Sequence, residues 1–317
     1  MCAMNKADSK AGSTPKTVEV IGAPIGLASP SVGVSLGPDA IRLAGLRESM
    51  DRLGWKCVDH GNLPSLEEPF PPRYFPPGTV RYLDEIVPYQ KGVHDRVRDA
   101  LKQNRLPLVL GGDHSIAIGS ISAVLAHWRE QWISPGLLWF DAHADLNTDQ
   151  TSPSGNIHGM PLAAAMGRGH ARLCELFDGK FVDPKRAVLF GVRSVDPEES
   201  RIVREMGIKV YTMKDIDELG AVNCIREAIQ ICSPRGEPVH ISFDIDGIDE
   251  RMVPGTGTPV AGGLTLREAH LVLELFCETN AIRSIDMVEV NPLLDFQNQT
   301  AKTALALIES ALGKVIY

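Results

Sequence analysis

The sequence predicts an α/β protein in which helices cover both faces of a mostly parallel sheet. Short apolar runs alternate with amphipathic stretches about eight times after residue 17. Runs that are apolar throughout are typical of strands buried on both faces, which is the setting of a parallel sheet. The chain contains no linker, charge block or internal repeat, so we expect one domain. Periodicity leaves open whether the sheet is open or closed into a barrel.

Each expected strand is a short apolar run, and most runs are followed by Gly, Asp or Asn. The expected strands are residues 18–21, 55–58, 106–110, 137–140, 187–190, 208–211, 239–243 and 284–290. Helical patterns fill the intervals between them. The expected helices are residues 38–53, 80–104, 116–129, 161–177, 197–206, 223–231, 266–279 and 300–312. Pro38 suits the first turn of a helix, whereas Pro88 is expected to interrupt one.

Composition excludes several classes of protein. The hydrophobic content of 44% and the charged content of 23% are globular values. No stretch approaches the roughly 20 apolar residues of a membrane span. The net charge of −8 argues against nucleic acid or an anionic membrane as a partner. Six scattered cysteines indicate reduced thiols, and therefore a cytoplasmic protein.

The N-terminal segment, residues 1–16, differs in character from the rest of the chain. It is polar and lacks the apolar core of a secretory signal, so we expect a disordered arm. Residues 17–317 would then form a single catalytic domain.

Polar side chains follow the apolar run at residues 137–140. Asp141, His143 and Asp145 occupy alternate positions, so an extended backbone would place them on one face. The carboxyl end of a parallel strand is where α/β sheets bind ligands. Carboxylates and an imidazole this close need a cation between them, and a metal ion is the simplest one.

Three further strand ends carry similar groups. Asp113 and His114 follow one strand, Asp244 and Asp246 follow another, and Glu289 lies near the end of a third. Any one of these acids could be a helix cap or a loop residue. In a parallel sheet, however, all these ends lie at one edge and can converge.

Four carboxylates and two imidazoles suit a pair of divalent ions that share bridging carboxylates. The donor set is rich in oxygen, contains some nitrogen and has no sulfur, which favours Mn²⁺ over a structural Zn²⁺.

These motifs resemble those of a known family. Residues 111–115 (GGDHS), 141–145 (DAHAD) and 242–249 (SFDIDGID) are similar to the three metal motifs of the ureohydrolases. Within that class the chain is most similar to the arginase family, and the similarity runs from about Val18 to the C-terminus. The additional markers are residues 21–24, 33–38, 154–159, 255–259 and 288–292.

The resemblance implies a three-layer α/β/α sandwich with a mostly parallel sheet of about eight strands. It also implies two Mn²⁺ ions per subunit and hydrolysis of L-arginine to L-ornithine and urea by a hydroxide that bridges the ions. Such proteins are commonly homotrimers. Carried over by motif, the ligands of one ion are His114, Asp141, Asp145 and Asp244. Those of the other ion are Asp141, His143, Asp244 and Asp246.

The catalytic roles follow from the groups in this setting. Glu289 can pair with the guanidinium of the substrate, because a carboxylate matches that cation. Asp145 is placed to pass a proton to the leaving amine. His158, in the loop after the metal motif, is the candidate proton shuttle, although alone it would be an ordinary loop histidine.

The amino-acid end of the substrate would meet loop residues. Asn147, Ser154 and Asn156 can donate to the α-carboxylate, and Asp196 can meet the α-ammonium. Thr258 would contact the substrate or shape its loop. Without the resemblance these residues would be ordinary turn formers.

The chain departs from the family pattern at several positions. Ser194 stands where many arginases have Asp, and Glu250 stands where Pro is usual. The loop over residues 26–32 has no basic residue. Arg267 and Glu268 match positions that pair between subunits, but an exposed pair at a helix start would contribute little.

Three other functions are compatible with the sequence. The chain could be another ureohydrolase, acting on agmatine, guanidinobutyrate or formiminoglutamate. A metal-dependent deacetylase is a more distant alternative. A binding or regulatory pseudoenzyme is a third, although such proteins typically lose ligands and here all six are present.

Overall fold

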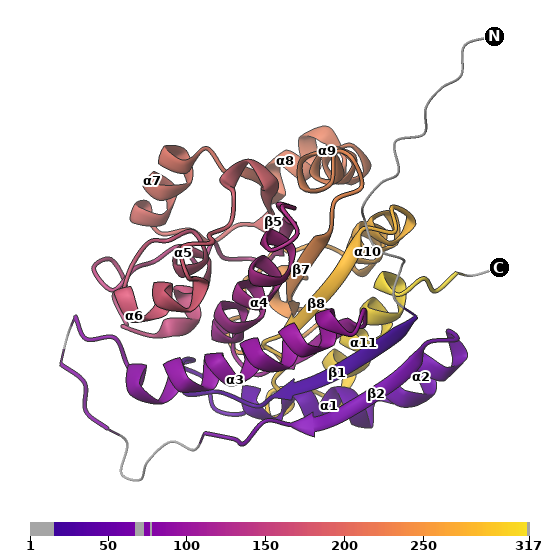
Figure 1. The fold of residues 1–317 in the computed structure, drawn as a ribbon, viewed down its shortest axis with the longest axis horizontal. Coiled ribbons are helices and arrows are strands. Elements are labelled where there is room, and N and C mark those ends of the chain that lie inside the picture. Colours follow the sequence, from indigo (N-terminus) through magenta and orange to yellow (C-terminus); the bar gives the residue numbers. More distant parts are fainter. Residues whose placement is uncertain (1–15, 67–72, 77, 316–317) are drawn as a thin grey trace.

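The computed structural model describes residues 16–66, 73–76 and 78–315. The arm expected at residues 1–16 lies outside the described residues except for Lys16. The described strands form one eight-stranded parallel sheet with β2 and β6 at its edges. Figure 1 shows β2 beside β1. Its order is β2-β1-β3-β8-β7-β4-β5-β6. The sheet is therefore open and is not a barrel.

The strands and helices alternate along the chain, as predicted. The strands are β1 Thr17–Ala23, β2 Lys56–Asn62, β3 Leu106–Gly111, β4 Gly136–Phe140, β5 Ala187–Val192, β6 Lys209–Thr212, β7 Val239–Asp244 and β8 Ile282–Val288. The α-helices are α1 Gly37–Leu43, α2 Leu46–Arg52, α3 Leu83–Lys102, α4 Ala117–Arg129, α5 Pro161–Ala165, α6 Ala171–Cys174, α7 Pro197–Met206, α8 Met213–Leu219, α9 Ala221–Cys232, α10 Leu266–Glu278 and α11 Gln299–Ala311. Short 3₁₀ turns include His114–Ile116, Ile157–Gly159 and Ile245–Gly247.

Two hydrophobic cores lie on opposite faces of the sheet. In β4, Leu138 and Phe140 face the core shared with α1, α2 and α8 to α11. Leu137 and Trp139 face the core shared with α3 to α7. This division follows from the alternation of side chains along a strand. The layers of helices, sheet and helices confirm the predicted α/β/α sandwich.

Several predicted boundaries were wrong. The helix expected at 38–53 is two helices, because Gly45 has a φ of 105° that ends helical geometry between them. The helix expected at 161–177 is likewise broken, at Gly167 and Gly169. By contrast, α3 continues through Pro88.

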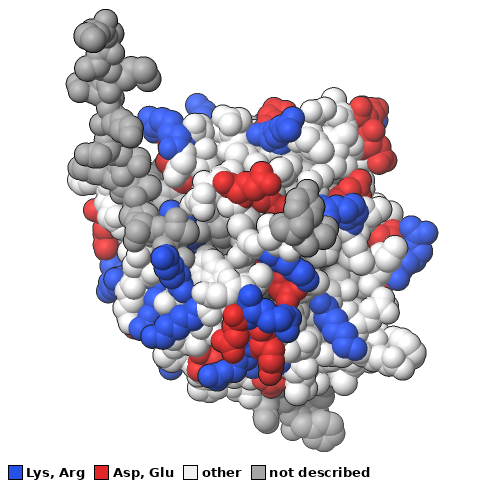
Figure 2. Space-filling view, turned by 90° about the vertical axis from the view of Figure 1, so that its right-hand side faces the viewer, with Lys and Arg blue, Asp and Glu red and all other residues white. Residues whose placement is uncertain are grey.

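Opposite charges lie close together on the surface. Figure 2 shows this on the side of the molecule that is at the right of Figure 1, where lysines and arginines neighbour acidic side chains. Exposed pairs of this kind contribute little to stability, so the fold depends on its two cores. Within the described part of the chain, no helix has the length and apolar character to cross a membrane.

Candidate active site

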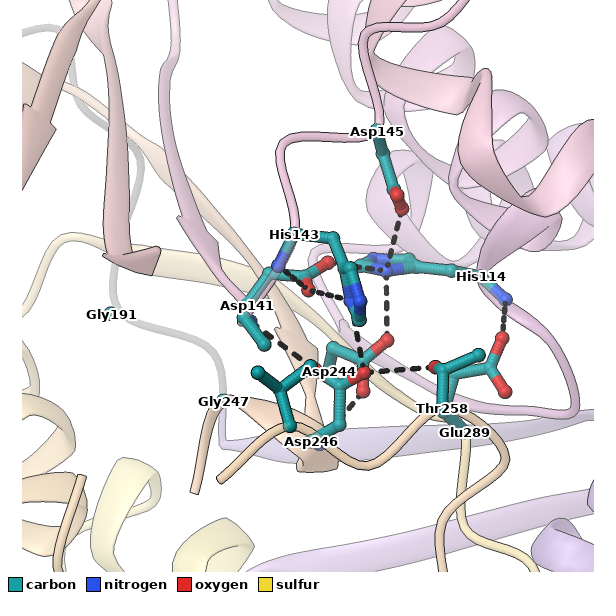
Figure 3. Close-up of polar contacts among 12 residues, drawn as sticks. His114, Asp141, His143, Asp145, Gly191, Asp244, Asp246, Gly247, Thr258 and Glu289 are labelled. Carbon is teal, nitrogen blue, oxygen red and sulfur yellow. Dashed lines mark hydrogen bonds and ion pairs between the residues drawn. The ribbon is translucent and has the colours of Figure 1, made fainter. Parts of the chain in front are cut away.

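The order of the sheet brings the predicted residues together. β3, β8, β7 and β4 are neighbours at its centre, and each ends on the same edge. His114 follows β3, Glu289 follows β8, Asp244 ends β7 and Asp141 follows β4 (Figure 3). Residues far apart in the sequence thus form one cluster.

The first group of ligating atoms surrounds the imidazole of His114. Its Nδ1 lies 3.0 Å from Asp141 Oδ2, 3.2 Å from Asp244 Oδ2 and 3.3 Å from Asp145 Oδ2. His114, Asp141 and Asp244 are buried. Three carboxylates therefore converge on one nitrogen atom.

The second group surrounds the imidazole of His143. Its Nδ1 lies 3.1 Å from Asp246 Oδ2 and 3.4 Å from Asp141 Oδ1. Thr258 donates a hydrogen bond to Asp246 Oδ2 at 3.0 Å, which orients that carboxylate. Asp141 presents one oxygen to each imidazole, so it joins the two groups.

The donor atoms fit a pair of metal ions. Within each of two groups the ligating atoms lie within 4.8 Å of one another; the groups are His114, Asp141 and Asp244, and Asp141, His143 and Asp246. His114 Nδ1 is buried without a hydrogen-bond partner in the described chain. Such an orphaned atom facing carboxylates has an explanation if a cation binds there. Oxygen donors with imidazole suit divalent ions such as Mn²⁺.

The charges of the site hold protons in the absence of metal. Burial lowers the pKa of His114, but the carboxylates of Asp141 and Asp244 outweigh this effect and raise that pKa well above its usual value. Burial also lowers the pKa of His143, but the carboxylates of Asp141 and Asp246 outweigh burial and raise this pKa to about 12. Burial and the charges of Asp246 and Asp141 raise the pKa of Asp244. A divalent ion would replace these protons.

Two of the predicted catalytic residues have strained backbones. Asp145 has a φ of 50° and Glu289 a φ of 61°, both in the left-handed region. Residues with side chains adopt this region at a cost of order 1–3 kcal/mol, and such strain clusters at functional sites. The carbonyl of Asp145 accepts hydrogen bonds from Leu162 and Ala163 of α5, which hold it in place.

Glu289 and His158 lie side by side. Glu289 Oε1 accepts a hydrogen bond from the backbone N–H of His114 at 3.0 Å and lies 3.5 Å from His158 Nδ1. Glu289 Oε2 is buried and has no hydrogen-bond partner among the described residues. One carboxylate oxygen is therefore fixed and the other is unpaired, although Glu289 is buried and is not one of the residues that line the cavity above the cluster.

A cavity of about 220 Å³ opens above the cluster. The predicted substrate residues all line it: Asn147, Ser154, Asn156, Asp196 and Thr258. Asn147 donates a hydrogen bond to Asp196 Oδ2 at 2.9 Å, so these two side chains are already coupled. His158 and Ser194 also line the cavity.

Sequence reasoning missed three residues that support the site. Trp139 stacks on His114, with ring centroids 4.1 Å apart, and donates a hydrogen bond to Asp141 Oδ2. Ser242 Oγ lies 2.9 Å from His114 Nε2. Glu199 accepts from the backbone N–H of Leu146, next to Asp145, and lines the cavity. Trp139 and Ser242 could have been found, because each lies two positions before a predicted ligand on its strand.

The fold and the site together define the ureohydrolase class of hydrolases. A protein-family comparison agrees, because the description "Arginase family" matches residues 16–313. The chain belongs to the arginase family and is a hydrolase. This assignment replaces the deacetylase and pseudoenzyme alternatives.

Named relatives extend over nearly the whole chain. The arginase of Bacillus caldovelox is 43% identical over 306 residues, which cover 94% of this chain and 99% of that protein. Its native structure matches with a TM-score of 0.90, 42% identity and coverage of 95% and 100%. The arginase of Entamoeba histolytica in complex with L-ornithine matches with a TM-score of 0.86, 32% identity and the same coverage.

Proposed function

We propose that this chain hydrolyses L-arginine to L-ornithine and urea with two bound Mn²⁺ ions. The observation that carries the proposal is the pair of ligand groups that share Asp141 beneath the cavity. The residues that would hold one ion are His114, Asp141, Asp145 and Asp244. Those that would hold the other are Asp141, His143, Asp244 and Asp246. When bound, such ions lower the pKa of water and supply a nucleophile near neutral pH.

The guanidinium of the substrate would be held by Glu289. Its free Oε2 offers a buried negative charge, and the hydrogen bond from the His114 backbone fixes the orientation of the carboxylate. Charge-assisted pairing of this kind is strong and directional. Glu289 therefore orients the carbon that is attacked.

Protons would be moved by Asp145 and His158. Asp145 lines the cavity, so its carboxylate can accept a proton from the nucleophile and pass it to the leaving amine. His158 lines the cavity beside Glu289 and can exchange that proton with solvent. Asp145 would act at the buried end of the site and His158 at its open end.

The amino-acid end of arginine would lie at the mouth of the cavity. Asn147, Ser154 and Asn156 would donate to the α-carboxylate, while Asp196 would accept from the α-ammonium. The structure of the Entamoeba histolytica relative with L-ornithine, an amino acid with the same two groups, supports this choice of substrate class.

A substrate panel tests the proposal. Urea release should be measured on arginine, agmatine and guanidinobutyrate after chelation and re-addition of Mn²⁺, Co²⁺ or Zn²⁺. We expect arginine with Mn²⁺ to give the highest kcat/KM. A Ser154→Ala/Asn156→Ala variant should lose much of its preference for arginine over agmatine, because agmatine lacks the carboxylate. Comparable turnover of both substrates by the unaltered chain would contradict the assignment to arginine.

A further inference from the structure

Arg193 follows β5 and makes an unusual set of contacts. Its guanidinium donates six hydrogen bonds, all of them to backbone carbonyl oxygens. The acceptors, at 2.6–3.2 Å, belong to Gly191, Asp246, Gly247, Ile248 and Val260. No carboxylate in the described chain forms an ion pair with it. The side chain therefore holds backbone segments in place and does not pair directly with a carboxylate.

The guanidinium holds the turn that carries Asp246. Three of its acceptors are the consecutive carbonyls of residues 246–248. A fourth, Val260, lies two positions after Thr258, whose hydroxyl donates to Asp246 Oδ2. Arg193 thus fixes both the backbone of Asp246 and the segment that orients its side chain.

The backbone of Arg193 holds a second ligand turn. The N–H groups of Arg193 and Ser194 both donate to the carbonyl of Ala142, at 2.9 Å each. Ala142 lies between Asp141 and His143, and its own N–H donates to Asp246 Oδ1 at 3.2 Å. One residue therefore connects the two turns that supply the second ligand group.

The first ligand group is connected to Arg193 only in part: it shares Asp141 with the second group, and its Asp244 lies two positions before Asp246. His114 and Asp145 come from other segments, and none of the hydrogen bonds of Arg193 in the described chain reaches them. The influence of Arg193 on the two groups is accordingly unequal.

The chemistry of the guanidinium suits this role. It is planar, permanently charged and presents five N–H donors in a fixed fork, which a lysine ammonium cannot reproduce. Gly263 leaves the space that it needs, since a Cβ there would lie 2.6 Å from Arg193 Nη2. Groups that orient metal ligands from outside the coordination sphere typically change affinity about 10–100-fold when replaced.

We propose that Arg193 is a positioning residue that sets the affinity of the second ion site, whose ligands include Asp141, His143 and Asp246, to a greater extent than that of the first. The inference rests on the proposed two-ion function. It assigns to the Arg193 side chain the pre-organisation of the turn at residues 246–248, whereas the contact with Ala142 is made by backbone that every substitution retains.

Metal stoichiometry tests the proposal. Arg193→Met, Arg193→Lys and the unaltered chain should be loaded with Mn²⁺ and freed of excess metal, and manganese per subunit should be measured by elemental analysis. Electron paramagnetic resonance should distinguish a coupled pair from a single Mn²⁺. Arg283→Met is the control, because Arg283 likewise donates hydrogen bonds to backbone carbonyls, those of Asn280 and Ile282 near the start of β8, and is more buried than Arg193. Circular dichroism should establish that each variant is folded.

We expect two ions in the unaltered chain and in Arg283→Met. Arg193→Met should keep about one ion and lose the signature of the coupled pair, with affinity for the second ion lowered about 10–100-fold. Arg193→Lys keeps the charge but not the fork, so it should change in the same direction. If Arg193→Met does not fold, Arg193→Lys alone tests the proposal.

Equal metal loss in the Arg193 and Arg283 variants, or two ions retained with unchanged affinity by Arg193→Lys, would overturn the positioning role and leave the proposed function intact. An unaltered chain that binds fewer than two ions would overturn the two-ion function and this inference with it.

Discussion

At the scale of single residues, the contacts of His114 determine which nitrogen can meet a cation. Ser242 Oγ lies at hydrogen-bond distance from Nε2, and Trp139 stacks on the ring. When a cation replaces the proton on Nδ1, Nε2 can keep its own proton and donate it to Ser242, so that the lone pair of Nδ1 faces the cation. The hydroxyl therefore selects the tautomer, and the indole fixes the plane of the ring.

His158 is the residue whose role is tested most simply. Burial lowers its pKa, but Glu289 outweighs burial and raises that pKa, so the ring can hold a proton close to the site. Because positioned proton transfer contributes about 10²–10⁴-fold, we expect His158→Asn to lower kcat about 10²-fold. Steady-state urea release measures this. Added imidazole should restore part of the rate, and manganese content should not change.

Unchanged turnover in His158→Asn would remove this histidine from the mechanism. A loss of turnover accompanied by a loss of manganese would instead indicate a structural role.

The ligands could be predicted from the sequence because they follow the ends of apolar strands. The extended backbone expected there was wrong, because Asp246 lies in the 3₁₀ turn Ile245–Gly247 and Asp145 has a φ of 50°. Arg193 could not be found in this way. Its partners are backbone carbonyls up to 67 positions away, and carbonyls carry no signature in the sequence.

At the scale of elements, glycine conformation explains where prediction failed. The apolar pattern over residues 38–53 is helical throughout, yet Gly45 adopts a φ of 105° and separates α1 from α2. The helix α8, Met213–Leu219, was not predicted at all; it begins with a capping box in which Thr212 and Asp215 bond reciprocally. Pro88 is the sixth residue of α3, and the helix continues through it although proline has no N–H to donate to the carbonyl four positions before it.

Two glycine-to-alanine substitutions should change stability in opposite directions. Gly45→Ala places a side chain at a left-handed position and should lower the free energy of unfolding by about 1–2 kcal/mol. Gly92 lies inside α3, and a Cβ there meets only Leu63 at 3.9 Å. Gly92→Ala should therefore raise the free energy of unfolding by about 0.5–1 kcal/mol. Urea denaturation measures both.

Two shifts of the same sign would contradict this account of the helix boundary. Neither substitution should alter the KM for arginine, because both positions lie outside the cavity.

Arg267 and Glu268, at the start of α10, each have a partner within the same chain. Glu268 accepts hydrogen bonds from Thr265 in a capping box, and Arg267 pairs with Glu274 in the same helix. The pairing of Arg267 and Glu268 between subunits stays a prediction.

At the scale of the whole molecule, the order of the sheet makes the site. β3, β8, β7 and β4 come from distant parts of the chain but lie side by side, so their ends meet. The sequence predicted that parallel strand ends would share one edge, but not which strands would be neighbours. The homotrimer and the cytoplasmic location stay predictions.

Binding of Mn²⁺ should release protons from the whole cluster. In the metal-free protein the carboxylates raise the pKa of His143 to about 12, and burial raises that of Asp244. Both groups are therefore protonated near neutrality to a greater extent than free side chains. Affinity for Mn²⁺ should fall as pH falls, about tenfold per pH unit for each proton displaced.

Calorimetric titration in two buffers of different ionisation enthalpy measures the protons released. Binding heats that are the same in both buffers would contradict the protonation described here. Titration of His143→Ala should release fewer protons than titration of the unaltered chain.

The most direct test of the account is anomalous diffraction at the manganese edge from crystals of the Mn²⁺-loaded protein. The account predicts two peaks at the strand ends, one beside His114 and Asp145 and the other beside His143 and Asp246. A single peak, or peaks away from these side chains, would contradict it.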